Sequence, residues 1–397
     1  MKRKAFEMNH FCPICLTGDL SSLDARDDVP ILMNRCYATA QEGREATRGS
    51  LALMGCKSCG FVWNAAFDPS LIVYDASYEN DQTHSSAFAR HLNERARDVA
   101  DAVPAGSLID FLEVGCGQGR FIEELALVAS DRLRSAEGFD PAWRGVDAAG
   151  PSGSRIHICY FDKLTSARLL HAPNVVVTRH TIEHVPDPVA FLSAIREALG
   201  PEAKATIFIE TPCVEWILGN EAMQDFFYEH CSLFTANALA DALHRAGFFG
   251  ARVDHVFGGQ YLWARAVTVS EQSTQSVTPA RPRPALEGAR QQFTRKWRAD
   301  VAERAAAGPI ALWGAGAKGV NFALMVDPQS SIIDHVIDIN PAKQGKYLPG
   351  SGVRVLSPMV AASRNASTIY VMNPNYLDEI RAIATEAGIT AQFVPIN

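Results

Sequence analysis

The sequence predicts an α/β protein with two Rossmann-like units that follow a small N-terminal metal-binding module. Two glycine-rich turns, at residues 113–119 and 314–319, each follow a short apolar run and precede a helical pattern. Strand, glycine turn and helix in this order form a nucleotide cradle at the carboxyl end of a sheet strand. Two Cys-x-x-Cys pairs, starting at Cys12 and at Cys56, precede both units.

Length and composition limit the class of protein. A chain of 397 residues is long enough for two to three domains, and 47% hydrophobic residues is ordinary for globular protein. The formal net charge of -7 disfavours a nucleic-acid partner, which would favour a basic face. No apolar run approaches about 18 residues, and the basic residues 1–4 precede no apolar segment. We therefore expect a cytoplasmic protein, monomeric or homodimeric, without a nucleic-acid or membrane partner.

The N-terminal region, residues 1–80, carries the metal-site pattern. Each Cys-x-x-Cys places two thiolates on one tight turn, and two such turns complete a tetrahedral zinc site. The segment has few large apolar residues, so we expect a structural zinc ion to stabilise it. The alternative is a set of free or redox-active cysteines. We interpret Cys36, between the pairs, as a packing or linker residue. The predicted ligands are Cys12, Cys15, Cys56 and Cys59.

Residues 81–268 alternate between strand and helix patterns. The second strand, 135–140, ends in Asp140, about twenty residues after the glycine turn, where a ribose diol is usually bound. The other predicted strands are 107–112, 155–159, 174–178 and 205–210, with a closing hairpin at 252–257 and 261–267. The predicted helices are 87–103, 189–199 and 237–246.

The C-terminal region repeats the strand, glycine turn and helix. Residues 269–286 are polar and proline-rich, which predicts a linker. The unit at 287–397 is smaller, and its second strand ends in Asp338. Its Gly-x-Gly-x-x-Gly turn alone would suggest a nicotinamide dinucleotide, but the unit is short and lacks obvious residues for hydride transfer. Its predicted strands are 310–313, 332–338 and 367–372, between helices 286–307 and 375–387.

The middle region resembles the class I S-adenosylmethionine-dependent methyltransferases. The run Glu113-x-Gly115-x-Gly117-x-Gly119 matches their first motif, and Gly138-Phe139-Asp140 and His-x-x-x-His-Val-Pro-Asp-Pro follow in the family's order. The resemblance implies that the glycines line the methionine and ribose, Asp140 binds the ribose hydroxyls, and Glu113 acts through its backbone or on the amino group. A Rossmann-like domain for another nucleotide is the alternative. The implied cofactor residues are Glu113, Gly115, Gly117, Gly119, Asp140, Asp162 and His180, the last of which could instead serve only in packing.

The C-terminal region resembles the C-terminal domain of the sugar C-methyltransferases in three segments, 314–319, 336–350 and 372–380. That family places a zinc module, a methyltransferase domain and this domain in the same order. The resemblance implies methylation, through an enolate, of a carbon adjacent to the ketone of a nucleotide-linked keto-deoxysugar. The substrate would lie between the middle and C-terminal domains. The implied substrate residues are Tyr74, Tyr78, Gly314, Gly316, Lys318, Gly319, Asp338, Gln344 and Lys346.

Such a reaction requires a base, stabilisation of an enolate oxygen and alignment of the methyl group. The family's corresponding stretch supplies the proposed base, and Glu229 and His230 match it directly. The family's tyrosine falls on Phe227, with Tyr228 one place along, and we retain Tyr228 as a candidate catalytic residue. This departure favours His230 as the base, with Glu229 orienting it or a water. His184 matches a further active-site histidine, which would bind the ketone oxygen or position the sugar.

Three alternatives remain open from the sequence. The acceptor atom could be an oxygen, a nitrogen or a phosphonate-type group, because class I domains methylate many nucleophiles. The chain could instead be a non-enzymatic zinc-ribbon scaffold that binds a nucleotide. Lys318, Lys343 and Lys346 could be solvated surface residues, or Lys346 could join the glycine-loop amides in binding a pyrophosphate.

Overall fold

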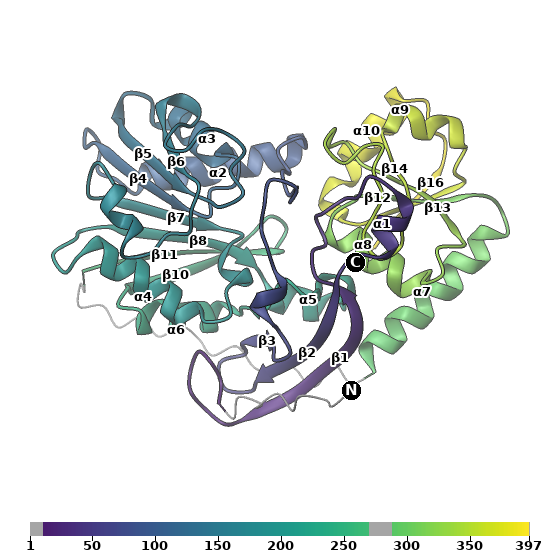
Figure 1. The fold of residues 1–397 in the computed structure, drawn as a ribbon, viewed down its shortest axis with the longest axis horizontal. Coiled ribbons are helices and arrows are strands. Elements are labelled where there is room, and N and C mark those ends of the chain that lie inside the picture. The colour runs from purple at the N-terminus through teal and green to yellow at the C-terminus, as the bar shows by residue number, and fades with distance from the viewer. Residues whose placement is uncertain (1–10, 270–287, 397) are drawn as a thin grey trace.

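The computed structural model describes residues 11–269 and 288–396. In this part of the chain the strands form three sheets. Figure 1 shows a small N-terminal sheet lying between two α/β units. The predicted linker, 269–286, falls almost entirely outside the described residues. No helix in the described ranges is both long and apolar enough to span a membrane.

The N-terminal sheet takes its fourth strand from the methyltransferase-like unit. The order is β1 (Leu20–Pro30), β2 (Arg48–Cys56), β3 (Val62–Asn64) and β9 (Ser232–Leu233), and every neighbouring pair is antiparallel. The short helix α1 (Ala40–Arg44) connects β1 to β2. Because β9 comes directly after the predicted catalytic stretch, the N-terminal sheet determines where that stretch lies.

The apolar residues of the N-terminal region do not form a separate core. Ile31 and Leu51 share one core with Phe322 of the C-terminal unit. Phe61, beside the cysteines, shares another core with Leu239 of the middle unit. The expectation that the metal compensates for a weak core was therefore incomplete, because burial against both neighbours also stabilises this region. The pattern of one segment cannot reveal partners that are remote in sequence.

The middle unit is a seven-stranded sheet within residues 109–267. Its strand β11 runs in the opposite direction to the other six. Its order is β10 (Phe249–Val256), β11 (Tyr261–Val267), β8 (Thr206–Pro212), β7 (Val175–Arg179), β4 (Ile109–Val114), β5 (Leu133–Phe139) and β6 (Arg155–His157). Helices α2 (Ser86–Asp101) and α3 (Arg120–Ala129) cover one face, and α4 (Pro188–Leu199) and α6 (Ala236–Arg245) cover the other (Figure 1). Helix α5 (Val214–Gly219) follows β8. The predicted class I methyltransferase fold is confirmed.

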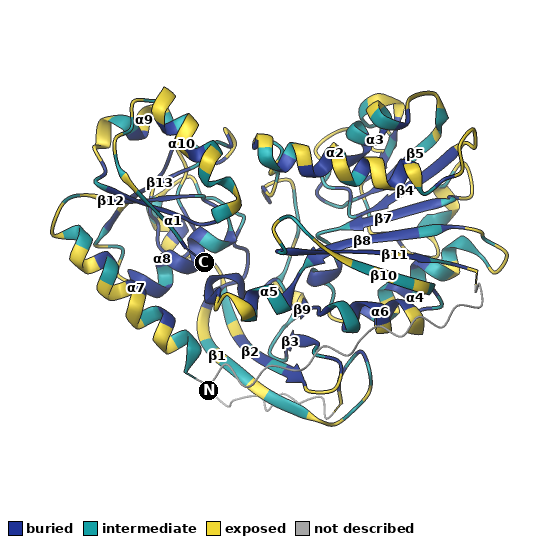
Figure 2. Ribbon diagram, turned by 180° about the vertical axis from the view of Figure 1, so that it is seen from behind, coloured by how far each residue is buried: buried dark blue, intermediate teal, exposed yellow. Residues whose placement is uncertain are grey.

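The C-terminal unit is a five-stranded parallel sheet. Its order is β14 (Val355–Leu356), β13 (Ile333–Ile337), β12 (Ile310–Trp313), β15 (Thr368–Val371) and β16 (Gln392–Pro395). The helices are α7 (Ala289–Ala305), α8 (Ala317–Val326), α9 (Pro358–Ala361) and α10 (Leu377–Glu386). Figure 2 shows the central strands of both α/β units buried between partly exposed helices, whereas the edge strand β10 is partly exposed. The predicted Rossmann-like character is confirmed, and β14 and β16 add to the predicted strands.

The two α/β units also contact each other directly. The Glu379 carboxylate, in the first turn of α10, accepts hydrogen bonds from the Ser85 hydroxyl at 2.5 Å and the Ser86 N–H at 2.6 Å. Glu379 therefore caps the N-terminus of α2, where negative charge is favoured. Nearby, the side-chain amides of Gln260 and Asn373 exchange hydrogen bonds of 2.8 and 3.0 Å. The C-terminal unit thus bonds directly to α2, one of the helices that cover the sheet of the middle unit.

This contact can be tested by substituting Glu379 with alanine. We expect faster amide hydrogen exchange in the first turn of α2 and a loss of about 1 kcal/mol in the free energy of unfolding, because the cap is removed. The matched control is Asp378→Ala, since the neighbouring Asp378 side chain is exposed and, within residues 11–269 and 288–396, pairs only with the exposed Arg381, at 3.8 Å. Equal exchange in the two variants would contradict the capping role.

Candidate active site

The first glycine turn has the geometry of a nucleoside cradle. Gly115, Gly117 and Gly119 have φ angles of 77°, 54° and 71°, a region that favours glycine. A Cβ on Gly115 would lie 2.0 Å from the Thr181 hydroxyl, so no larger residue fits there. A Cβ on Gly117 would meet nothing within 4 Å, which leaves room for a ligand beside the backbone.

Asp140 follows β5 and lies against this turn. Its carboxylate accepts the Gly117 N–H and the Ala142 N–H, each at 2.7 Å. Burial raises the pKa of Asp140 despite these two hydrogen bonds. Because an acid at this position can accept hydrogen bonds from a ribose diol, the turn and Asp140 together fit the nucleoside of S-adenosylmethionine.

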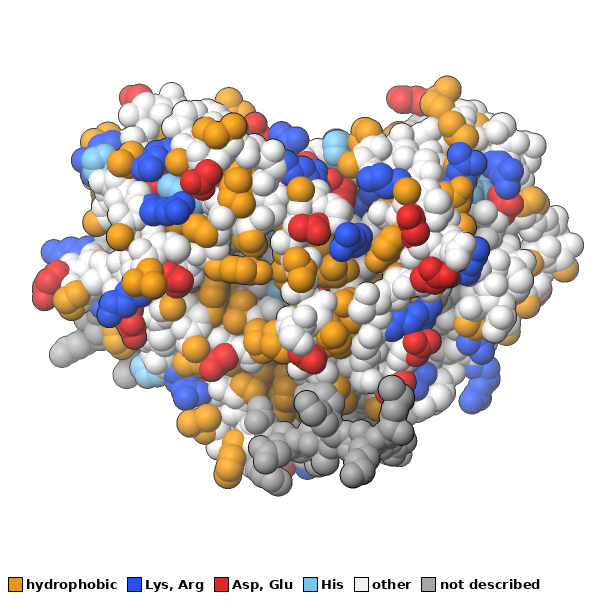
Figure 3. All heavy atoms as spheres, viewed as in Figure 1, with side chains coloured by type: hydrophobic (Ala, Val, Ile, Leu, Met, Phe, Trp, Pro, Cys, Tyr) orange, Lys and Arg blue, Asp and Glu red, His pale blue; other side chains and the backbone are white. Residues whose placement is uncertain are grey.

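A cavity of about 270 Å³ lies between the two α/β units, where the space-filling surface dips between them in Figure 3. All three parts of the chain contribute to its wall. The N-terminal region and the middle unit contribute Asn34, Tyr78, His180, Glu183, His184, Phe227, His230, Gln260 and Tyr261. The C-terminal unit contributes Gly314, Gly316, Lys318, Gly319, Asp338 and Lys343. The cavity therefore joins two of the predicted catalytic residues, His184 and His230, to the second glycine turn.

Two histidines meet at one wall of the cavity. The rings of His184 and His230 lie edge to face, with centroids 4.8 Å apart. The Phe227 ring lies 4.0 Å from His230 on another side. The Tyr74 hydroxyl lies 2.8 Å from His184 Nδ1. Burial raises the pKa of Tyr74 well above its ordinary value, so we assign the phenol as the donor and Nδ1 as the acceptor.

The ionisable groups at this wall are held neutral. Burial lowers the pKa of His184, and burial together with His184 lowers the pKa of His230 well below its ordinary value. Burial also raises the pKa of Glu229 to about 8, although the Met33 N–H donates to its Oε1 at 3.1 Å. A neutral imidazole has a free lone pair, so His230 is suited to accept a proton from a bound substrate.

Tyr228 points away from the cavity. Its hydroxyl accepts the Asp68 N–H at 2.8 Å and donates to the Asp68 carbonyl at 3.3 Å. Its ring packs so closely on Gly49 that a Cβ there would lie 2.5 Å from it. The geometry does not support the prediction of a catalytic Tyr228. Phe227 lines the cavity instead, and the chain turns directly after it, at residues 228–229.

The positions of three lysines differ from those expected from the sequence. Lys343 is buried, and its Nζ donates to the Ala315 carbonyl at 3.2 Å and to Asn34 Oδ1 at 3.4 Å. Lys318 Nζ lies 3.0 Å from a carboxylate oxygen of Asp225. Lys346, in contrast, is exposed and does not line the cavity. The sequence left Lys343 open as a surface residue, but its buried ammonium group lies beneath the second glycine turn.

The turn after β13 explains the position of Lys343. The Asp338 carboxylate accepts the Asn340 N–H at 2.8 Å, and the Asn340 side-chain carbonyl accepts the Ala342 N–H at 2.9 Å. These two side-chain turns fold the chain back so that the next residue, Lys343, lies under the glycine loop. An Asp-x-Asn-x-x-Lys spacing after a strand was the signal in the sequence that could have indicated this.

The second glycine turn repeats the first. Asp338 also accepts the Ala315 N–H at 2.7 Å, as Asp140 accepts that of Gly117. A Cβ on Gly319 would lie 2.0 Å from the Gly314 carbonyl oxygen, so helix α8 packs tightly on its own loop. Gln344 donates to the Asp338 carbonyl at 3.0 Å and lies outside the cavity wall.

The remaining predicted residues separate into two groups. Tyr78 lines the cavity directly, whereas Tyr74 contacts His184 at the wall. Asp162 lies in an exposed turn, where its carboxylate accepts the Leu164 and Thr165 N–H groups. The sequence analysis did not select Asn34 or Gln260, which lie in segments without a recognisable motif.

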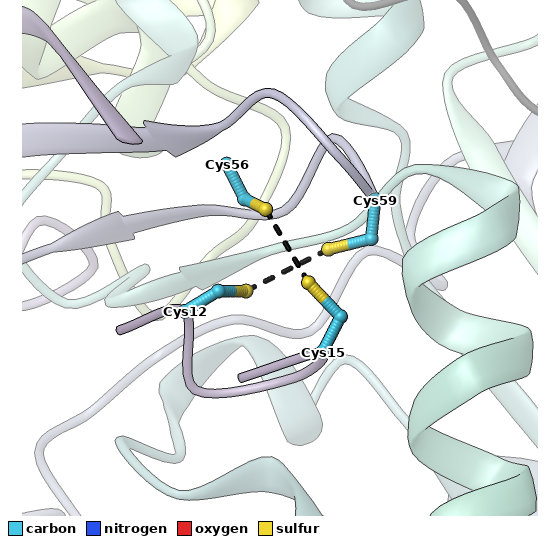
Figure 4. Close-up of side chains that lie close together, drawn as sticks. All are labelled: Cys12, Cys15, Cys56 and Cys59. Carbon is cyan, nitrogen blue, oxygen red and sulfur yellow. Dashed lines mark hydrogen bonds between the residues drawn. The ribbon is translucent and has the colours of Figure 1, made fainter. Parts of the chain in front are cut away.

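The four cysteines of the two Cys-x-x-Cys pairs converge, as Figure 4 shows. The sulfur atoms of Cys12 and Cys59 are 3.6 Å apart, those of Cys15 and Cys56 are 3.4 Å apart, and all four lie within 4.8 Å of one another. Four sulfurs around a zinc ion, each at about 2.3 Å, would be about 3.8 Å apart. The donor set and its spacing therefore fit zinc.

Family models match both α/β units. A methyltransferase domain model matches residues 88–250, and a C-methyltransferase C-terminal domain model matches residues 286–395. Both α/β units are therefore similar to domains of methyltransferases. The methyltransferase match includes the first glycine turn and His184, and the second match includes the turn at 314–319.

Individual relatives are similar over part of their length. A ubiquinone biosynthesis O-methyltransferase of Cereibacter sphaeroides is 31% identical over 109 residues, 26% of this chain and 42% of that protein. The C-methyltransferase NovU of Streptomyces niveus is 25% identical over 225 residues, 52% of each chain. This chain thus spans about half the length of the curated relatives it matches. A methyltransferase structure from Aquifex aeolicus aligns with 17% identity and a TM-score of 0.35, covering 51% of this chain and 100% of that one.

The two buried histidines predict how stability depends on pH. Their folded-state pKa values lie below the unfolded value of about 6.5, so the unfolded state takes up more protons below that pH. The free energy of unfolding should therefore fall as pH drops below about 6.5, by up to about 1.4 kcal/mol per pH unit for each histidine. His230→Gln should flatten this slope in denaturant titrations, whereas the exposed His244→Gln should not. An unchanged slope in His230→Gln would refute this account.

Proposed function

We propose that the protein is an S-adenosylmethionine-dependent C-methyltransferase that methylates the carbon adjacent to the ketone of a nucleotide-linked keto-deoxysugar. The observation that carries the proposal is the single cavity that joins His230 to the second glycine turn. The match to a C-methyltransferase C-terminal domain and the similarity to NovU support carbon as the acceptor atom.

In this proposal the protein supplies the proton transfer and the alignment. His230, held neutral, takes the proton from the carbon adjacent to the ketone. His184 borders the same space, and we assign its imidazole to the developing enolate oxygen, where a donor stabilises negative charge. The bound cofactor would supply an electrophilic methyl group, which the carbanion accepts. Because His184 and Tyr74 are already hydrogen-bonded, the wall is preorganised and much of the rate would come from positioning.

The nucleotide part of the substrate is assigned to the C-terminal unit. The N-terminus of α8 and the glycine-loop amides favour a diphosphate. Lys318 and Lys343 line the same space and would neutralise its charge. Asp338, at the end of β13, would accept hydrogen bonds from the ribose of the nucleoside. We replace the predicted Lys346 with Lys343 in this role, because only Lys343 reaches the cavity.

The zinc ion is assigned a structural role, because four thiolates leave no open position for a substrate. The metal-binding turns also dock on α6. Thr235, which caps α6, donates to the Cys59 carbonyl at 2.7 Å, and Arg245 donates to the Pro13 carbonyl at 3.2 Å. Zinc would thus hold the N-terminal sheet against the middle unit.

Oxygen is the second candidate acceptor atom. The similarity to an O-methyltransferase and the replacement of the family's tyrosine by Phe227 both favour it. A carbon NMR spectrum of the product made with labelled methyl donor separates the two, since a methyl on oxygen resonates far from a methyl on carbon. A methyl on oxygen or nitrogen would rule out the first proposal.

The assignment of His230 predicts the outcome of deuterium wash-in at the substrate carbon. His230→Ala should slow both exchange and methylation by at least about 100-fold, because the base is removed. Tyr228→Phe should exchange at nearly the wild-type rate, since its hydroxyl bonds only to the Asp68 backbone among the described residues. Wild-type exchange by His230→Ala would refute the assignment of the base.

Removal of a cysteine ligand tests the metal site. The purified protein should contain about one zinc ion per chain by mass spectrometry. Cys56→Ser should lose this metal and unfold at lower temperature, because metal binding contributes folding free energy. Cys36→Ser is the matched control, as Cys36 lies between the pairs and packs on the core shared with the C-terminal unit. Equal zinc content in both variants would contradict the four-cysteine site.

A further inference from the structure

A cysteine, a glutamate and a histidine converge beside helix α5, away from the four-cysteine site. Cys213 lies between β8 and α5, Glu215 lies in the first turn of α5, and His255 belongs to the edge strand β10, which Figure 2 shows. Their sulfur, oxygen and nitrogen donor atoms all lie within 4.8 Å of one another. None of the three belongs to a motif recognised in the sequence, so their meeting is a product of the fold.

The register of the middle sheet brings His255 to Cys213. His255 pairs with Leu262 of β11, and Leu262 pairs with Thr211 of β8, so these three residues form one row across the sheet. Directly paired side chains share a face of a sheet, and so do residues two apart along a strand. Accordingly, Leu262 and Cys213 lie in one buried core with Leu239 of α6. The cluster therefore forms on the face of the sheet that α6 covers.

The distances between the donor atoms suit a metal ion. Glu215 Oε2 lies 3.9 Å from Cys213 Sγ and 3.5 Å from His255 Nε2. Around a tetrahedral zinc ion with ordinary bond lengths, a sulfur and an oxygen ligand would be about 3.6 Å apart, and an oxygen and a nitrogen ligand about 3.4 Å apart. The described residues supply three donors, which leaves the fourth position for water. Only a small contraction of the cluster is needed to coordinate an ion.

Backbone N–H groups hold two of the three donors in place. The Ala236 N–H, at the start of α6, donates to Glu215 Oε2 at 3.1 Å. The Trp216 N–H donates to Cys213 Sγ at 3.4 Å. Outer contacts of this kind orient metal ligands in proteins. Cys213 is fully buried, whereas the Glu215 and His255 side chains are 32% and 48% exposed, so an ion can enter from solvent.

We propose that Cys213, Glu215 and His255 form a binding site for Zn²⁺, separate from the four-cysteine site and independent of the proposed function. Thiolate and imidazole ligands select Zn²⁺ over Mg²⁺ or Ca²⁺, which prefer oxygen. Binding displaces the thiol proton to solvent. The ion would tie β10 to α5, whose residues Trp216 and Ile217 line the cavity. It would therefore stabilise part of the cavity wall.

The test titrates Co²⁺ into the purified full-length protein whose four-cysteine site carries its zinc ion. Three ligands hold an ion less tightly than four thiolates, so the new site fills when the metal is added. We expect one further ion per chain, with the absorption band of sulfur-to-cobalt charge transfer, while the resident zinc is retained. The absence of a further ion, an ion bound without this band, or release of zinc in proportion to the band would each overturn the proposal.

The histidine ligand gives the sharpest comparison. His255→Ala should weaken binding of the added cobalt at least about 10-fold, because one ligand is lost. The side chain is about half exposed on an edge strand, so this variant should fold. His244→Ala is the matched control, since His244 is an exposed residue of α6 outside the cluster, and should bind cobalt as the wild type does. Equal cobalt affinity in the two histidine variants would overturn the proposal.

The cysteine ligand identifies the origin of the absorption band. Cys213→Ser should lose the sulfur-to-cobalt band, whereas Cys159→Ser should keep it, because Cys159 lies outside the cluster. A band of wild-type strength in Cys213→Ser would overturn the proposal. If Cys213→Ser does not fold, the comparison of the two histidine variants decides the outcome.

Discussion

The pairing of β3 with β9 is the interaction on which the arrangement of the active site depends. Val62 pairs with Leu233, and Trp63 with Ser232, so the chain just after His230 becomes part of the N-terminal sheet. The chain turns at residues 228–229, just before β9, so this pairing fixes the position of the turn and of the residues beside it. In this arrangement Phe227 and His230 line the cavity, whereas the Tyr228 hydroxyl bonds to the Asp68 backbone. The β3–β9 pairing thus helps to place the side chains proposed as catalytic.

The N-terminal sheet packs against both α/β units. Its residues share one core with the C-terminal unit and its metal-binding turns share another with the middle unit. The second glycine turn consequently lines one cavity with His184 and His230 of the middle unit, although these residues belong to separate α/β units. A substrate bound to one turn and a methyl donor bound to the other would be aligned by packing that neither unit provides alone, and this alignment is a large part of catalysis by proximity.

Features that depend on a few neighbouring residues were predicted from the sequence. The glycine turn at 113–119, the cysteine pairs and the alternation of strands and helices each need only a few neighbouring residues, and each was located. The direction of Tyr228 and the burial of Lys343 were not, because they depend on β9 and on two side-chain turns after Asp338. Likewise, the apolar residues of the N-terminal region suggested a weak core, since their partners lie in segments remote in the sequence.

The two glycine turns share a backbone plan but differ in charge, and the difference indicates which ligand each one takes. Around the first turn the nearby side chains include Glu113 and Asp140, which favour a cofactor with a positive sulfonium and an ammonium group. Lys318 and Lys343 stand at the second turn, where Gly319 lets α8 begin close to the loop. Cations and helix-terminal amides together suit a diphosphate. Under the proposed function, this difference in charge would direct the methyl donor to the first turn and the anionic part of the substrate to the second.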